Sequence, residues 1–103
     1  MSEEKRAQAI KYLEEVTQEL INRERKLEVI DSEISTLSYQ LRTTDNDRTI
    51  LKGDPVLIAS SGSLRKSLQL KLRSAEQERM RALEAVQSAL QRRQLVLEEL
   101  EQL

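Results

Sequence analysis

All of the strong helix breakers in this chain lie near its midpoint. Gly53, Pro55 and Gly62 are the only glycines and the only proline among 103 residues. Glycine and proline are the residues least compatible with a helix interior. The sequence therefore predicts one domain, residues 1–103, made of a helix over about residues 2–43, an irregular segment over about 44–62 and a second helix over about 63–103.

Both predicted helices carry apolar residues at heptad spacing. A repeat sustained over this many heptads predicts a coiled coil rather than a disordered chain. The composition agrees, because 34% of the residues are charged and only 2% are aromatic, which suits a narrow seam between helices better than a wide core. The first seam is Leu13, Val16, Leu20, Leu27, Ile30, Ile34, Leu37 and Leu41, and the second is Leu68, Leu72, Ala75, Leu83, Val86, Leu90, Leu97 and Leu100.

The two seams match when the chain folds back on itself. Residues at the same height in an antiparallel hairpin have a nearly constant sum of residue numbers, and Leu41 with Leu68 or Leu20 with Leu90 meet this condition. The spacing around Arg79 predicts a stutter that locally unwinds the supercoil. The predicted fold class is mainly all-α: an antiparallel two-helix coiled-coil hairpin with a short β-hairpin at the turn.

Three arginines, Arg23, Arg79 and Arg93, interrupt the seams. In the favoured interpretation their methylene stems cover the seam while their guanidinium groups reach flanking carboxylates. In the other, they fix the register or contact a third helix. The expected carboxylates are Glu84 for Arg23, Glu28 or Asp31 for Arg79, and Glu14 or Glu15 for Arg93.

The middle segment contains two short β-prone runs, 49–51 and 56–59, around a link with Gly and Pro. Such a pattern predicts a β-hairpin, followed by a serine cap for the second helix at Ser60, Ser61 or Ser63. These aliphatic residues could fold back onto the helix ends. We favour an assembly element that pairs with other chains, because five large aliphatics are many to leave at a turn. The predicted assembly residues are Ile50, Leu51, Gly53, Val56, Leu57 and Ile58.

This layout resembles a β-type prefoldin subunit. That family has a short strand, a glycine, a second apolar strand, a capping turn and a helix that opens with leucines; the matching residues are 49–53, 56–58, 60–63 and 64–68. The architecture is similar over the whole chain, and the residues are similar in the middle segment alone. The resemblance implies an ATP-independent holdase without cofactors. Its subunits join through their β-hairpins into a hetero-hexamer, and clients are passed to a chaperonin.

The resemblance also implies where unfolded clients bind. In that family the free ends of the coiled coil grip the client. Leu13, Leu97 and Leu100 can equally be explained as seam residues, whereas Ile10, Tyr12, Val96 and Leu103 are expected to lie off the seam. The predicted client-binding residues are Ile10, Tyr12, Leu13, Val96, Leu97, Leu100 and Leu103.

Charge and residue types argue against several other functions. The net charge is −1, from 17 basic and 18 acidic residues, so neither nucleic acid nor an anionic membrane is an expected partner. The chain has no His and no Cys, which removes the commonest general base and the thiolate nucleophile. We therefore expect no enzyme activity, no metal and no cofactor. The lack of a signal-like or membrane-spanning apolar stretch favours the cytoplasm.

Two alternatives to a chaperone remain open at this stage. One is a coiled-coil structural adaptor or escort protein of the flagellar and type III secretion export-stalk type, whose members generally lack a β-hairpin at the turn. The other is a tether in a larger coiled-coil complex. A tether requires a row of apolar residues outside the seam, and the first helix offers only Ile21 and Val29 for it.

Overall fold

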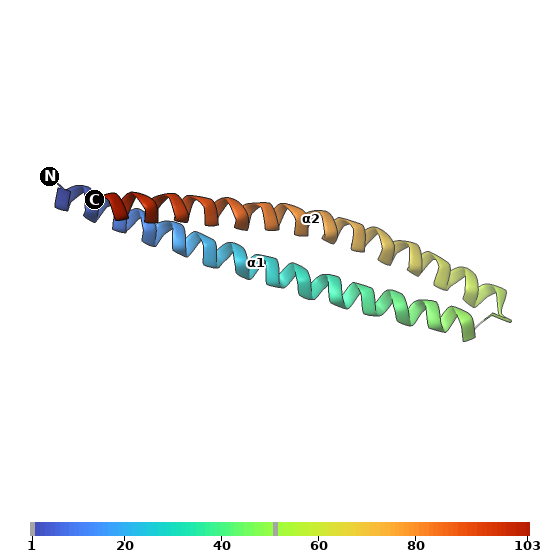
Figure 1. Ribbon diagram of the computed structural model, residues 1–103. Helices are drawn as coiled ribbons and strands as arrows, with labels where there is room; N and C mark the ends of the chain where they lie inside the picture. Colours follow the sequence, from blue (N-terminus) through green and yellow to red (C-terminus); the bar gives the residue numbers. More distant parts are fainter. Residues whose placement is uncertain (1, 51) are drawn as a thin grey trace. The chain divides into compact units, whose positions relative to one another are not determined.

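The computed structural model describes residues 2–50 and 52–103, which form two long helices (Figure 1). Helix α1 runs over Ser2–Ile50 and helix α2 over Pro55–Gln102. The described residues contain no β-strand. The predicted all-α class with two helices is therefore confirmed, and both helices are longer than the sequence predicts.

The chain divides into two compact units, each built from a segment of both helices. The terminal unit consists of Met1–Glu28 with Met80–Leu103, and the turn unit consists of Val29–Arg79. In each unit the α1 segment packs antiparallel against the α2 segment. Both ends of the chain belong to the terminal unit, and the connection between the helices belongs to the turn unit.

The core of the terminal unit is a narrow seam that combines large and small side chains. Leu20 and Val86 pack with Ala89, and Leu27 packs against this cluster. Ala89 is 0% exposed. Alanine at this position lets the leucines of α1 approach α2 closely, which is how a seam this thin excludes water.

The core of the turn unit uses larger residues from both helices. Leu37, Leu68 and Ala75 are buried together, and three further aliphatics pack against them. This cluster confirms the predicted seam of the turn unit. The additional residues are Ile34, Leu41 and Leu72.

The seam of α2 in the terminal unit differs from the prediction. Ala82, Ala89 and Val96 are buried, whereas Leu83 and Leu97 are half-buried and Leu90 is exposed. The predicted seam residues Leu83, Leu90 and Leu97 were therefore placed one position too far along the helix. The inward row alternates in steps of four and three through this region, so the predicted stutter is absent; the row is Ala75, Arg79, Ala82, Val86, Ala89, Arg93, Val96 and Leu100.

Helix α2 begins at an aspartate that the sequence-based prediction overlooked. Asp54 Oδ1 accepts hydrogen bonds from the backbone N–H groups of Val56 at 3.1 Å and Leu57 at 3.2 Å. The Asp54 carbonyl accepts from the Ile58 N–H at 3.0 Å. Asp54 is thus an N-cap, and Pro55 occupies the first helical position, where its missing N–H has no consequence. The predicted caps at Ser60, Ser61 and Ser63 instead lie inside α2.

The predicted β-hairpin is replaced by helix on both sides of the turn. Thr49 and Ile50 are the last residues of α1, and residues 56–58 are in the first turns of α2. An isolated two-stranded hairpin is marginal in water, while extending an existing helix adds one hydrogen bond per residue fixed. Helix α2 begins at the Asp54–Pro55 pair and continues through Gly62. Glycine at that helical position costs about 1 kcal/mol relative to alanine.

Candidate protein-binding surfaces

The predicted assembly residues are found at a helical turn instead of in strands. Ile50, Val56 and Leu57 are exposed and Ile58 is half-buried. Gly53 lies in the turn itself, with open space around it. Leu51 lies outside the described residues. The structure therefore leaves apolar side chains at the turn open to solvent, without a strand edge in the described part of this region.

The predicted client-binding residues separate into three groups. Ile10, Tyr12 and Leu103 are exposed, as the sequence suggests. Leu13, Leu97 and Leu100 are half-buried. Val96 is buried in the seam, so its predicted place off the seam is wrong. The register shift of α2 explains this error, because Val96 occupies the inward position that the sequence analysis gave to Leu97.

A row of leucines on the flank of α2 is the feature that sequence analysis missed. Leu83, Leu90 and Leu97 recur every seven residues and therefore lie on one stripe of the helix, beside the buried row. We call these three residues the outer row. Leu90 is 46% exposed, although the residue before it, Ala89, is fully buried. The outer row lies within the terminal unit.

Helix α1 contributes apolar residues to the same flank of the terminal unit. Arg93 lies between Leu90 and Leu97 along the helix surface, and its Nε donates a hydrogen bond to Thr17 Oγ1 at 3.2 Å. Thr17 therefore marks the side of α1 that faces the outer row. Ile10 lies seven residues before Thr17 and Ile21 four residues after it, and both are exposed. The outer row thus extends onto α1.

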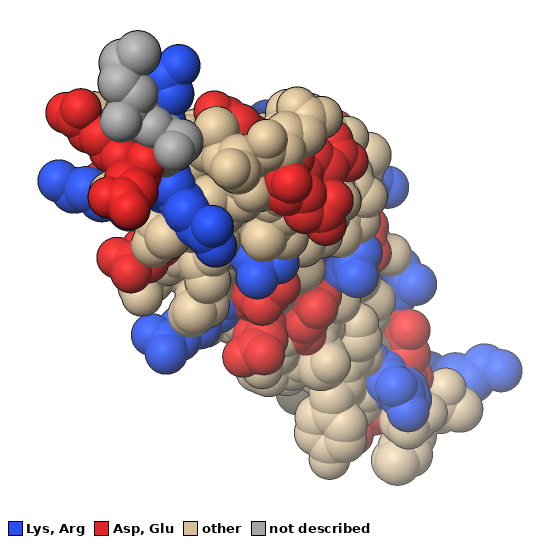
Figure 2. Space-filling model, turned by 60° about the vertical axis from the view of Figure 1, so that its left-hand side comes forward, with Lys and Arg blue, Asp and Glu red and all other residues tan. Residues whose placement is uncertain are grey.

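The outward side of Leu90 on α2 is lined by uncharged residues. Its neighbours there, at helical spacing, are Gln87, Gln91 and Gln94, and all three are exposed; Arg93 lies on its inward side. Elsewhere Lys, Arg, Asp and Glu are interspersed over the surface, as the face in Figure 2 shows. Loss of charged residues around an apolar centre is a compositional mark of protein interfaces. Leu90 therefore has the surroundings expected of an interface residue.

The seam arginines are held by specific contacts within each unit. Arg23 Nη1 donates to the Ala85 carbonyl at 2.6 Å, and Arg23 also pairs with Glu19 rather than with the predicted Glu84. Arg79 Nε pairs with Asp31 Oδ1 at 2.6 Å, which confirms one predicted partner. Arg93 contacts Thr17 in place of the predicted glutamates. Arg23 and Arg93 are half-buried, whereas Arg79 is exposed.

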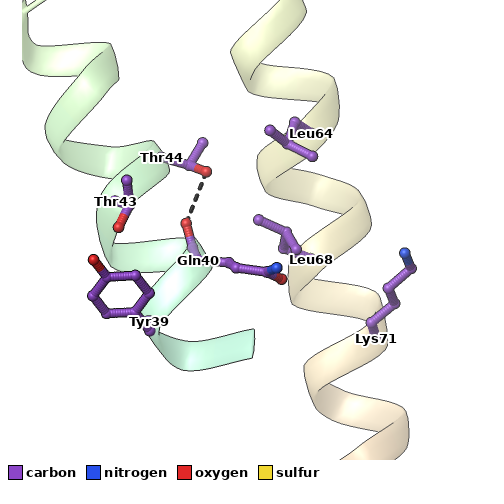
Figure 3. A pocket seen from close by; sticks show the side chains of 7 residues that line it. All are labelled: Tyr39, Gln40, Thr43, Thr44, Leu64, Leu68 and Lys71. Atoms are coloured by element: carbon purple, nitrogen blue, oxygen red, sulfur yellow. Dashed lines mark hydrogen bonds between the residues drawn. The ribbon is translucent and has the colours of Figure 1, made fainter. Parts of the chain in front are cut away.

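A shallow groove of about 410 Å³ opens in the turn unit (Figure 3). Leu64 and Leu68 of α2 face Gln40 and Thr44 of α1 across it. Thr44 is 7% exposed, and its hydroxyl donates to the Gln40 carbonyl at 2.9 Å. The groove exists because a small polar residue occupies a seam position where a leucine would fill the space. The remaining lining residues are Tyr39, Thr43 and Lys71.

The described residues contain no group of three or more His, Cys, Asp or Glu side chains placed to hold a metal ion. Within residues 2–50 and 52–103, neither helix has a stretch that is long and apolar enough to cross a bilayer.

Comparisons of the chain with protein-family models, with curated proteins and with solved structures return no match. The resemblance to prefoldin therefore depends on the sequence layout alone. The exposed apolar surfaces of the two units are the remaining structural indication of function.

Proposed function

We propose that this chain is a non-catalytic coiled-coil adaptor that binds a helix of a partner protein along the outer row. The observation that carries the proposal is the contrast between Ala89 and Leu90. The seam is completed by the small residue, and the large one is left 46% exposed among three glutamines. Leucine at such a position leaves apolar surface that the seam of the hairpin does not use.

The spacing of the outer row suits a helical partner. Leu83, Leu90 and Leu97 repeat every seven residues, and a helix that docks in an apolar groove places its own anchors at matching intervals. Full burial of one leucine side chain is worth about 1.5–3 kcal/mol. Leu90 is 46% exposed, and Leu83 and Leu97 are half-buried, so a third helix would gain part of this free energy at each position. Ile10 and Ile21 beside them add exposed apolar surface.

The helical turn supports an adaptor over a prefoldin-type subunit. Export-stalk adaptors generally lack a β-hairpin between their helices, and residues 49–50 and 56–58 of this chain are helical. A row of apolar residues outside the seam is also what a tether in a larger coiled-coil complex requires. Both features agree with a protein that holds other helices together.

Site-specific photo-crosslinking tests the proposal. A photoreactive amino acid replaces Leu90 in one variant and Leu95 in the other, and both are expressed in the source cells. Leu95 is the matched control because it is a leucine of the same helix, 64% exposed, on a different face. We expect a discrete crosslinked partner from position 90 and none from position 95. Equal products from both positions, or none from position 90, would contradict the proposal.

An ATP-independent holdase is the second candidate, favoured by the exposed Ile10, Tyr12 and Leu103 of the terminal unit. Such a protein suppresses the aggregation of an unfolded client when the client is diluted from denaturant, which light scattering measures. The holdase function predicts suppression that is lost when Ile10 and Tyr12 are both changed to glutamine. An adaptor predicts no suppression by the unaltered chain.

A further inference from the structure

The seam of the turn unit becomes polar as it approaches the turn. Beyond Leu68, the inward positions include Thr44, Arg48, Ser61 and Arg65, all buried or half-buried. Arg65 Nε pairs with Asp45 Oδ1 at 2.6 Å at the edge of this region. Packing of large apolar side chains therefore contributes little to this part of the unit.

Several large aliphatic residues of the same region are exposed. Leu57 and Leu64 lie seven residues apart on one stripe of α2, and Leu64 is 52% exposed. Ile50, at the end of α1, is also exposed. Leucines that remain exposed beside a polar seam are the reverse of the arrangement that stabilises an isolated hairpin. The arrangement becomes favourable when another molecule covers the leucines.

The groove provides the place where such a molecule fits. Its volume of about 410 Å³ is within the roughly 300–1,000 Å³ typical of binding pockets. Figure 3 shows Leu64 and Leu68 between the two helices, with Tyr39 on the α1 side and Lys71 on the α2 side. The groove thus combines an apolar base with polar groups along both edges.

The charge of the groove selects the kind of partner. Lys71 is the charged residue of the lining, and it forms no ion pair with any residue that the structure describes. Residues 39–71 contain six Lys and Arg against three Asp and Glu. A second copy docked by the same region would bring together two positive surfaces, whereas a carboxylate beside an apolar side chain complements the groove.

We propose that this groove binds an acidic amphipathic helix of a partner protein. An apolar side chain of that helix packs on the exposed Leu64, and a carboxylate pairs with Lys71 Nζ. The site lies in the turn unit and involves none of the outer-row residues, so it is a second partner site that does not depend on the proposed function. An adaptor with both sites links two different proteins.

Fluorescence anisotropy with the full-length chain tests the proposal. The probes are two synthetic amphipathic peptides with the same leucine spacing, one flanked by glutamates and the other by lysines. We expect the glutamate peptide to bind more tightly. Leu64→Gln should weaken its binding at least about tenfold, the equivalent of 1.4 kcal/mol. Lys71→Glu should reverse the preference between the two peptides.

The chain offers a matched control for each variant. Leu70 and Lys66 are exposed residues of the same helix that line a different surface, so Leu70→Gln and Lys66→Glu should leave binding unchanged. Leu90→Gln should also leave it unchanged, which separates this site from the outer row. Circular dichroism establishes that each variant keeps its helices.

Three outcomes would overturn the inference. The glutamate peptide could fail to bind, it could bind Leu64→Gln as tightly as the unaltered chain, or Lys71→Glu could leave the preference unchanged. Sedimentation velocity addresses the competing occupant. If the chain forms a dimer that Leu64→Gln dissociates, a second copy fills the groove instead of an acidic partner.

Discussion

At the scale of single residues, the identity of the buried side chain in each adjacent pair sets the register of α2. Ala82 and Leu83, Ala89 and Leu90, and Val96 and Leu97 all offer two candidates for one seam position. The smaller residue is the buried one in each case. This choice allows close packing of the helices and leaves the leucines partly exposed.

Overpacking the seam tests this register. Ala89→Leu should lower the free energy of unfolding by about 1–3 kcal/mol, because the side chain has no space to occupy. Leu90→Ala should change it by no more than about 0.5 kcal/mol, as is usual at exposed positions. Urea unfolding followed by circular dichroism measures both. The opposite pattern, with Ala89→Leu tolerated and Leu90→Ala costing about 2–5 kcal/mol, would place Leu90 in the seam.

At the scale of secondary structure, the junction between the helices is determined by one capping residue. Asp54 receives two N–H groups of the first turn of α2, and Pro55 follows it at the first helical position. These local signals outweigh the β-propensity of the aliphatic run after them. The helix then includes residues that would otherwise have formed a strand.

Removal of the cap should destabilise the start of α2. Asp54→Ala is expected to lower the free energy of unfolding by about 1 kcal/mol. Asp54→Asn should leave the free energy of unfolding nearly unchanged, because asparagine caps equally well. Asp47→Ala, at an exposed position inside α1, is the control. Urea unfolding provides the measurement. If alanine at position 54 has no effect, α2 does not begin at this aspartate.

Substitution of Gly62 is expected to increase the stability of α2. It lies inside α2, and an added Cβ would meet only the Arg48 guanidinium, at 3.7 Å. Gly62→Ala should therefore raise the free energy of unfolding by about 1 kcal/mol, the difference in helix propensity. Thermal unfolding compared with the unaltered chain measures this. A loss of stability would indicate that residue 62 is in a turn, where the sequence analysis had placed it.

The sequence predicted the secondary structure more accurately than the exposed apolar surfaces. Two helices and the seam of α1 could be read directly, because Leu20, Ile30 and Leu37 are buried at the positions that the heptad spacing predicts. The α2 seam could not be read in this way, because two rows of apolar residues with equal spacing lie one residue apart. One is Ala82, Ala89 and Val96, and the other is Leu83, Leu90 and Leu97. The outer row depends on that register. The Asp54–Pro55 start was readable from sequence, but the β-prone run after it was given more weight.

At the scale of the whole molecule, each unit keeps apolar side chains that its own core does not use. The terminal unit has the outer row, and the turn unit has Leu57 and Leu64 above a polar seam. Separate surfaces of this kind suit a protein whose role is to bring partners together. The central claim is that the outer row is an interface with a different protein.

Native mass spectrometry of the chain purified from its source cells tests that claim most directly, using the unaltered chain, Leu90→Gln and Leu95→Gln. We predict a complex with a different protein in defined stoichiometry, retained by Leu95→Gln and lost from Leu90→Gln. A six-chain assembly of small coiled-coil subunits that survives Leu90→Gln would contradict the account and favour the prefoldin-like chaperone. A chain that is alone in all three samples would contradict it as well.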